Sequence, residues 1–485
     1  MLTLNDPTLL HDKNYVNGRW IESGINKKID VLNPATGELI VSVADGSVGD
    51  IREAVRSADI AMDEWSKCTA KHRARILKTW FDLIILHKDD LACIMTAEQG
   101  KPLVESKSEI SYGASYIEWF AEEAKRIYGD VIPSHGEDKR LLTIKQPVGV
   151  VAAITPWNFP CAMITRKAAP ALAAGCSIVI KPAAETPLSA LALAELASRA
   201  GIPNGVLNVV VGSNSVDIGK ELTLNETVRK VTFTGSTRVG KILLRQCADT
   251  VKKTSMELGG NAAFIIFDDA DLDKAVEGLM SAKFRNAGQT CVCANRILVH
   301  ESVYDSFSEK FTESVKKLLV GNGFDEGVSI GPLIDQKAHE NMLSLVNDAK
   351  GLGAEVIAGG KPSELGGNFF EPTVIKNATP EMRVFKEEIF GPIAPIFKFS
   401  SDQEVIEMAN CTEYGLAAYL YTSDIKRIFS VSESLEFGIV GVNEGIISTE
   451  VAPFGGVKES GSGREGSKYG IEDYVELKYI CIGGL

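Results

Sequence analysis

The sequence has no excess of positive charge and no long apolar run. Its 485 residues include 51 lysines and arginines against 64 aspartates and glutamates, a net charge of −13. A surface that binds nucleic acid needs a basic face to neutralise phosphates, so we expect no nucleic-acid partner. No unbroken apolar stretch reaches the roughly 18 residues of a membrane-spanning helix, so we expect no membrane span.

The cysteines, the N-terminus and the histidines argue in turn against disulfides, against a signal peptide and against a Cys–His or metal site. The nine cysteines are odd in number and scattered, which is typical of reduced thiols in a cytosolic protein. Residues 1–18 lack the basic start, apolar core and cleavage site of a signal peptide, so a cytoplasmic location is predicted. The six histidines lie outside every motif described below, which argues against a Cys–His hydrolase and predicts no metal site.

The chain is too long for one ordinary core, so two or three domains are expected. Residues 50–127 repeat apolar side chains at three- and four-residue spacing, which predicts helices, one of them ending at Gly100. After Pro147, short β-branched runs alternate with helical stretches, which predicts crossover units and a parallel sheet; the runs are 148–154, 177–180, 206–211 and 230–234.

One of these helices carries clear boundary signals, with Thr186 as N-cap, Pro187 at the first helical position and Gly201 as the stop. A second alternation of strands and helices from residue 261 onward suggests a second α/β unit. Residues 139–147 and 475–483 alternate apolar and polar side chains, as exposed edge strands do. Such strands commonly pair with something, and a second subunit is one option.

Three motifs follow predicted strands of the first unit. TPWNFP puts the amide of Asn158 where open α/β sheets bind ligands, although a simple turn explains it equally well. FTGSTRVG leaves space for a pyrophosphate beside Gly235 and Ser236 at a helix N-terminus, but it lacks the GxGxxG spacing and is a weak signal. Lys181 ends a buried strand, where it either meets a ligand or reaches out to solvent.

Two more segments offer reactive groups. Glu257 precedes two glycines and could be a general base, although a surface carboxylate is the commoner case. FRNAGQTCVCANR places Cys291 in a loop between a helix and a strand, where a thiol can meet substrate. Its C-x-C pair has only His300 nearby, too few ligands for a metal.

Taken together, the order and spacing of these motifs resemble the aldehyde dehydrogenase superfamily along nearly the whole chain. The resemblance implies the α/β aldehyde dehydrogenase fold: a Rossmann-type cofactor domain, an α/β catalytic domain and a small β oligomerisation extension. Their expected boundaries are 1–130 with 148–256, then 257–446, then 131–147 with 447–485. It also implies a homodimer or homotetramer, with the two edge strands as contacts.

The resemblance assigns roles to residues that match the family's motifs. Cys291 of GQTC is the nucleophile, Asn158 of PWNFP the side-chain half of the oxyanion hole, and Glu257 of ELGG the base that activates water. The remaining matches are cofactor-binding positions, namely Thr155, Pro156, Trp157, Lys181, Ala184, Gly235, Ser236, Glu388 and Phe390. The implied chemistry is thiohemiacetal formation, hydride transfer to a nicotinamide and hydrolysis of the resulting thioester.

Substrate and cofactor choice rest on a few further residues. Arg166, Arg285 and Ser448 match a pattern of succinate-semialdehyde dehydrogenases, and arginines would grip a carboxylate at the far end of the aldehyde. The alternative is that each arginine pairs with a structural acid. Glutarate semialdehyde is hard to exclude, since one methylene is worth only about 1–3 kcal/mol.

The cofactor is predicted to be NADP or NAD. NAD-preferring relatives often have a glutamate where this chain has Ala184, with the acid displaced to Glu185. Without that carboxylate a 2′-phosphate is not repelled, and Lys181 could pair with it. The serine that NADP-preferring relatives use is also missing. NADP is therefore expected to be accepted, with preference left open.

Two other hypotheses remain. A catalytically silent family member would be a structural or binding protein, but it predicts a damaged motif, and Asn158, Glu257 and Cys291 are all present. Cys293 lies two residues after the nucleophile, so in an extended segment both thiols would face the same way and could form a strained, regulatory disulfide. The alternative is that Cys293 packs inward.

Overall fold

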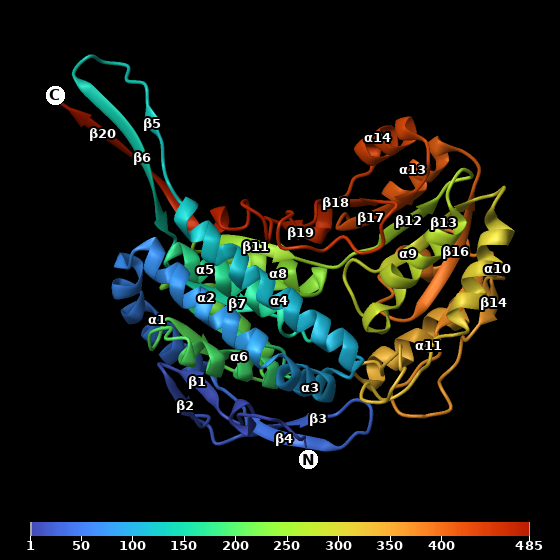
Figure 1. The fold of residues 1–485 in the computed structure, drawn as a ribbon, viewed down its shortest axis with the longest axis horizontal. Coiled ribbons are helices and arrows are strands. Elements are labelled where there is room, and N and C mark those ends of the chain that lie inside the picture. The colour runs from blue at the N-terminus through green and yellow to red at the C-terminus, as the bar shows by residue number, and fades with distance from the viewer. Residues whose placement is uncertain (1, 485) are drawn as a thin grey trace.

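The computed structural model describes residues 2–484, which form two sheet-based units and an arm that projects from them (Figure 1). The first sheet has eight strands in the order β19-β11-β10-β7-β8-β9-β1-β2. Its five central strands are parallel, and their chain order reverses between β7 and β10. In open α/β sheets such a switch point opens a crevice at the carboxyl ends of the strands. The strands are β1 (Asn14–Val16), β2 (Arg19–Ile21), β7 (Val150–Ile154), β8 (Ile178–Lys181), β9 (Leu207–Val209), β10 (Val228–Thr234), β11 (Lys253–Glu257) and β19 (Gly461–Ser462).

Helices cover this sheet, as the periodicity predicts. Those before β7 are α1 (Val48–Lys67), α2 (Ala70–Leu86), α3 (Lys88–Gln99) and α4 (Leu103–Glu123). Those that alternate with the parallel strands are α5 (Ala162–Ala174), α6 (Pro187–Arg199), α7 (Ser215–Leu224) and α8 (Thr237–Ala248). The expected stop at Gly100 is confirmed, because this residue closes α3 in the left-handed region with φ 92°.

The N-terminus of α6 differs from the prediction in one respect. Thr186 occupies the N-cap position and Pro187 the first helical position, but the threonine side chain makes no capping hydrogen bond. The carboxylate of Glu98 instead accepts from the backbone N–H groups of Leu188 and Ser189, at 2.7 and 2.8 Å. A carboxylate at this end of a helix is favoured by the helix dipole as well as by the two donors.

The second sheet is also mostly parallel and has its own switch point. Its seven strands follow the order β14-β15-β16-β13-β12-β17-β18, all parallel except β14, with a second switch point between β12 and β17. The strands are β12 (Ala262–Ile266), β13 (Ala294–His300), β14 (Glu355–Ala358), β15 (Thr373–Lys376), β16 (Ile393–Phe399), β17 (Ala417–Tyr421) and β18 (Ile439–Val442). The helices are α9 (Leu272–Phe284), α10 (Tyr304–Val315), α11 (Gln336–Gly351), α12 (Arg383–Lys386), α13 (Asp402–Asn410) and α14 (Ile425–Ser434). Beyond residue 320, the sequence pattern predicted neither the strands β14 and β15 nor the helices α11 to α14.

The two predicted edge strands pair with each other and form the arm. β6 (Lys139–Pro147) and β20 (Val475–Gly483) are antiparallel over their full length, and β5 (Val131–Ile132) adds a short third strand. Figure 1 shows this sheet extending away from both units, with the C-terminus near its tip. A separate hairpin of β3 (Lys28–Leu32) and β4 (Leu39–Ala44) lies near the N-terminus. Among residues 2–484, no helix is long and apolar enough to cross a membrane.

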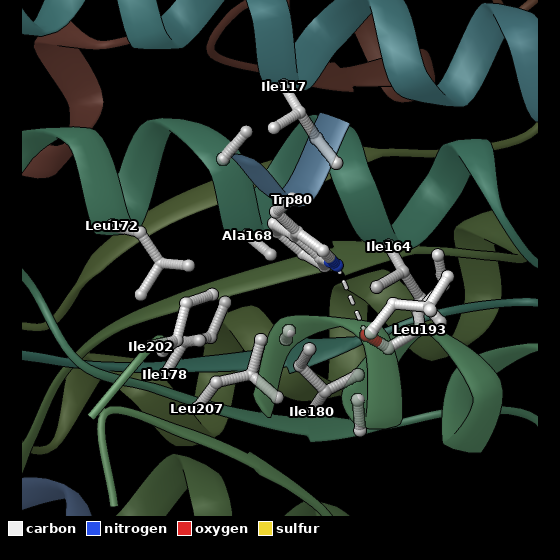
Figure 2. Close-up of a cluster of buried hydrophobic side chains, with 14 of the residues drawn as sticks. Trp80, Ile117, Ile164, Ala168, Leu172, Ile178, Ile180, Leu193, Ile202 and Leu207 are labelled. Atoms are coloured by element: carbon white, nitrogen blue, oxygen red, sulfur yellow. Dashed lines mark hydrogen bonds between the residues drawn. The ribbon is translucent and has the colours of Figure 1, made fainter. Parts of the chain in front are cut away.

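The largest hydrophobic core packs helices α2, α4, α5 and α6 against the first sheet. Figure 2 shows Trp80 of α2 surrounded by side chains of α4, α5, α6 and β8, and fully buried. Its indole N–H donates to the carbonyl of Leu193 at 3.2 Å, which satisfies the one polar atom of the ring. This core fixes α5, and therefore the loop between β7 and α5 that carries Asn158.

Trp80→Ala is expected to lower the free energy of unfolding by about 3–5 kcal/mol, because a large buried side chain leaves a cavity. Thermal unfolding measures the effect, with Tyr128→Ala, which removes an exposed ring, as control. An unchanged midpoint in the Trp80 variant would contradict this description of the core.

Candidate active site

Loops from both units meet in one cavity of about 210 Å³. The loops after β7 and β10, the segment after β11, the loop before β13 and the turn before β16 all contribute. The residues in its wall are Pro156, Trp157, Asn158, Thr234, Gly235, Ser236, Leu258, Gly259, Cys291, Glu388 and Phe390. Half of the candidate site residues from the sequence, eight of sixteen, are therefore brought together in this wall, although they lie far apart in the chain.

The turn between β10 and α8 leaves room for a ligand. A Cβ on Gly235 would lie 2.5 Å from the ring of Phe233, so only glycine fits there. The hydroxyl of Ser236 accepts from the first turn of α8, and the N-terminus of this helix favours anions. On the neighbouring strand end, the hydroxyl of Thr155 is buried and has no hydrogen-bond partner among the described residues. These features fit a dinucleotide phosphate.

Lys181 remains buried instead of reaching solvent. Its side chain is 5% exposed, and its Nζ donates to the hydroxyl of Ser215 at 3.2 Å. Burial lowers the pKa of Lys181, while the nearby Glu185 and Asp45 raise it. Within residues 2–484 no carboxylate lies at ion-pair distance from this amine, so it could pair with a ligand phosphate. Ala184, next to it, is half-buried and contributes no charge.

Aromatic rings and a carboxylate form the opposite wall. The rings of Trp157 and Phe390 meet edge to face with centroids 5.6 Å apart. Phe390 adopts a left-handed φ of 52°, rare for a bulky residue, which turns the chain between Glu388 and β16. Glu388 accepts from the backbone N–H of Gly260 at 2.9 Å, and burial raises its pKa to about 7.

The loop that carries Cys291 is sharply turned. Asn286 and Ala287 both adopt the left-handed conformation, with φ 52° and 53°. Downstream, the carbonyl of Cys291 lies so close to Gly260 that a Cβ there would be 2.2 Å from it. Gly260 is thus required by the close approach of the two backbones, which brings the loop of Cys291 near the segment after Glu257.

The environment of Cys291 keeps its sulfur protonated. Burial raises the pKa of this thiol to about 12. Arg166 and Arg285 are close enough to lower the pKa, while Glu388 and Glu257 raise it further. A thiol becomes a nucleophile only as the thiolate, so added positive charge is needed for reaction at neutral pH.

Asn158 presents an amide beside the nucleophile. Its Nδ2 donates to the carbonyl of Gln289 at 3.1 Å, and its Oδ1 accepts from the backbone N–H of Phe159 at 3.1 Å. These two bonds fix the orientation of the amide and leave its second hydrogen available. A preorganised donor next to an attacking thiol is what a developing oxyanion requires.

Glu257, at the end of β11, is 2% exposed, and neither of its carboxylate oxygens has a hydrogen-bond partner among the described residues. Burial raises its pKa well above the usual value, and the charge of Glu465 raises it further. Arg166, Lys167 and Arg464 act in the opposite direction. A buried carboxylate with a raised pKa is suited to accept a proton near neutral pH.

A buried ion cluster adjoins Glu257. Arg166 and Lys167, consecutive residues of α5, both donate to the carboxylate of Glu465 in the C-terminal segment. Burial alone would raise the pKa of Glu465, but the two cations hold it below its ordinary value. The guanidinium of Arg166 also stacks 4.0 Å from the ring centroid of Phe454. Its Nη2 has no hydrogen-bond partner in residues 2–484.

A second cavity, of about 310 Å³, adjoins the nucleophile loop. Arg285 and Ser448 lie in its wall, with Phe159 beneath the guanidinium at 5.4 Å. Arg166 does not belong to this wall, and its acid partner is Glu465. Of the three residues assigned to the substrate, two therefore share this cavity and the third is held in the ion cluster.

The extended geometry expected for residues 291–293 is wrong. The segment forms a turn, closed by a hydrogen bond from the N–H of Cys293 to the carbonyl of Thr290 at 3.0 Å. The sulfur of Cys293 is buried and donates to the carbonyl of Lys283, so it packs inward. A regulatory disulfide between Cys291 and Cys293 loses its geometric basis.

Several residues near the site went unnoticed in the sequence. They are Lys101, Glu105, Glu109, Tyr112, Lys167, Asn286 and Glu465. Nothing in their local patterns marks them, because each acquires its role from a partner distant in sequence, such as Glu465 from Arg166.

The cavity thus combines a crevice that fits a dinucleotide phosphate with the thiol of Cys291, as a dinucleotide-dependent enzyme requires. The model of the aldehyde dehydrogenase family matches residues 20–480, and the chain belongs to that family. It is 60% identical to the succinate-semialdehyde dehydrogenase [NADP(+)] of Escherichia coli (strain K12), with 99% of this chain and 100% of the relative covered. It is 58% identical to the glutarate-semialdehyde dehydrogenase of Pseudomonas aeruginosa, with both chains fully covered. A solved NADP-dependent enzyme of E. coli superposes with a TM-score of 0.98 at 60% identity, covering 99% of this chain and 100% of the other.

The raised pKa of Cys291 predicts a specific pH profile for alkylation without cofactor. Thiolate is the reactive form, so the rate with iodoacetamide should rise about tenfold per pH unit from pH 7 to 10 without a plateau. Mass spectrometry of the peptide containing Cys291 measures the rate, with free cysteine as reference. A plateau near pH 8 would contradict the assigned environment.

Proposed function

We propose that the protein oxidises succinate semialdehyde to succinate with NADP+ or NAD+. The observation that carries this proposal is the guanidinium of Arg285, which lies in the wall of the second cavity and forms no ion pair in the described part of the chain. Arg285 is also close enough to Cys291 to lower the pKa of its thiol. A substrate with an aldehyde at one end and a carboxylate at the other matches both groups. Ser448 offers a further hydroxyl in the same wall.

Each catalytic residue then has a distinct role. The thiolate of Cys291 attacks the aldehyde carbon, and the C–S bond forms as the carbonyl oxygen becomes an oxyanion. The free amide hydrogen of Asn158 and the backbone N–H of Cys291 would hold that oxyanion. When bound, the nicotinamide supplies the acceptor for the hydride that leaves the same carbon. Glu257 removes a proton from the water that hydrolyses the thioester, which releases the acid and restores the thiol.

The cofactor fits the residues present in the crevice. Gly235, Ser236 and the N-terminus of α8 would hold the pyrophosphate, and the buried hydroxyl of Thr155 lies at the neighbouring strand end. The amine of Lys181 is available to a 2′-phosphate, and the absence of a carboxylate at Ala184 removes repulsion toward one. The E. coli relative is named as a succinate-semialdehyde dehydrogenase [NADP(+)], which also supports NADP as the cofactor.

Glutarate semialdehyde is the second candidate, because the chain is 58% identical to a relative named for that substrate. The two semialdehydes differ by one methylene, worth only about 1–3 kcal/mol in a pocket. Both carry the carboxylate that Arg285 would bind.

Domain roles, assembly and location complete the proposal. Residues 1–130 with 148–256 would bind the cofactor, and 257–446 would carry the nucleophile. Residues 131–147 with 447–485 would mediate a homodimer or homotetramer in the cytoplasm. In support, β20 is an edge strand of the arm, and its exposed side chains include Leu477 and Tyr479.

Kinetics with NADP+ and NAD+ against succinate semialdehyde, glutarate semialdehyde and butanal test the proposal. Arg285→Met should raise KM for succinate semialdehyde about 10–100-fold, since a charge-assisted contact is worth about 1.5–3 kcal/mol. Butanal has no carboxylate, so its KM should change less than about threefold, given that the lost contact concerns the carboxylate alone.

Cys291→Ala should abolish turnover with every aldehyde, and Arg56→Met, which removes an exposed arginine, should change nothing. A wild-type enzyme that oxidises butanal as efficiently as succinate semialdehyde would overturn the substrate. Catalytic efficiency with NAD+ far above that with NADP+ would overturn the cofactor preference.

A further inference from the structure

Lys101 and Glu109 form an ion pair from which water is almost wholly excluded. Their side chains are each 1% exposed, and the Nζ of Lys101 donates to the carboxylate of Glu109 at 2.5 Å. Lys101 follows the left-handed Gly100 that closes α3, and Glu109 lies on α4. A buried ion pair is weak evidence for stability, because desolvation offsets the attraction. The presence of this ion pair at this place therefore needs an explanation other than stability.

The remaining donors of Lys101 are aimed at the loop that carries Asn158. The Nζ donates to the backbone carbonyl of Asn158 at 2.7 Å and lies 4.0 Å from the centroid of the Phe159 ring. A carboxylate, a carbonyl and an aromatic face thus occupy the surroundings of the ammonium group. Although Lys101 borders the second cavity, its charge is already engaged and is not free to bind a substrate carboxylate.

The backbone of Asn158 is held from two sides. Its carbonyl accepts a second hydrogen bond from Nδ2 of Asn286 at 3.0 Å, so both lone pairs are used. The same Nδ2 also contacts the carbonyl of Gln289 at 3.2 Å, the group to which the Asn158 side chain donates. The position of the Asn158 amide relative to the loop of Cys291 therefore depends on the contact with Lys101.

Glu109 extends the connection to the helix that follows. Its Oε1 accepts from the backbone N–H groups of Cys161 and Ala162, at 3.0 and 3.3 Å, at the N-terminus of α5. Through Glu109, Lys101 ties the carbonyl of Asn158 to the start of α5. Small displacements of a reacting or stabilising group are costly, since about 1 Å of misplacement can reduce rate about 100-fold.

We propose that Lys101, paired with Glu109, is a positioning residue that holds the Asn158 amide where the oxyanion of the reaction forms. The inference rests on the proposed function for the role of Asn158, and it adds a requirement on residues that no motif marks. It does not depend on which aldehyde is the substrate, because every aldehyde attacked by Cys291 forms the same oxyanion.

A double-mutant cycle tests the proposal. Lys101→Met should lower kcat about 10–100-fold, less than the 10²–10³-fold effect of roughly one lost oxyanion donor in Asn158→Ala. In the double variant the loss should stay within about threefold of Asn158→Ala alone, because the amide that Lys101 positions is already gone. Lys107→Met, on α4 with Glu109 but partly exposed and paired with Asp89, is the matched control and should keep wild-type kcat.

Alkylation of Cys291 by iodoacetamide separates positioning from general damage. This displacement forms no oxyanion, so its rate in Lys101→Met should remain within about threefold of wild type if the Cys291 loop is intact.

Lys101→Arg, which keeps the cation and its donors, should recover part of kcat. If Lys101→Met does not fold, Glu109→Gln replaces it in the cycle, since it removes the charge and keeps an oxygen for the N–H groups of α5.

Losses in kcat that multiply in the double variant would overturn the proposal, and so would a parallel fall in alkylation. If wild type fails to oxidise succinate semialdehyde, the proposed function fails instead. The same double-mutant cycle, with butanal or with whichever aldehyde the wild type oxidises, then still measures the coupling between Lys101 and Asn158.

Discussion

Arg166 and Lys167 share the carboxylate of Glu465 in a region from which water is excluded, and the charges of all three act on Glu257. It joins α5 to the C-terminal segment, across 299 and 298 residues of sequence. It also sets the local charge, because Arg166 acts on both Glu257 and Cys291. Removal of one partner would leave a buried charge uncompensated, which is far costlier than loss of a surface pair.

Burial raises the pKa of both Glu257 and Cys291, but it has opposite consequences for their reactivity. A buried carboxylate binds its proton more tightly, which makes Glu257 a stronger base once it is ionised. The same burial keeps the thiol of Cys291 protonated and unreactive until positive charge is brought to it. The thiol is thus held in its unreactive form, while hydrogen bonds with Lys101 and with one loop, residues 286–289, fix Asn158 in advance.

The sequence was most informative where function needs a local pattern. Apolar runs located the central strands, and Gly235 and Gly260 mark close approaches that a side chain would block. Prediction failed where a partner comes from far along the chain. Glu98 makes the capping bonds expected of Thr186, whereas the ion pair of Arg166 with Glu465 is the structural alternative that the sequence left open. The turn at residues 290–293 decides between the two directions that the sequence left open for Cys293, because the extended segment that a disulfide needs does not form.

In the proposed mechanism Glu257 acts after hydride transfer, on the thioester of Cys291. A rapid-mixing experiment with Glu257→Gln, NADP+ and the aldehyde tests it most directly, with reduced cofactor followed by absorbance. We expect a stoichiometric burst of reduced cofactor followed by turnover about 10²–10⁴-fold slower than wild type, the usual range for loss of a general base. Equal slowing of the burst and of steady-state turnover would contradict it.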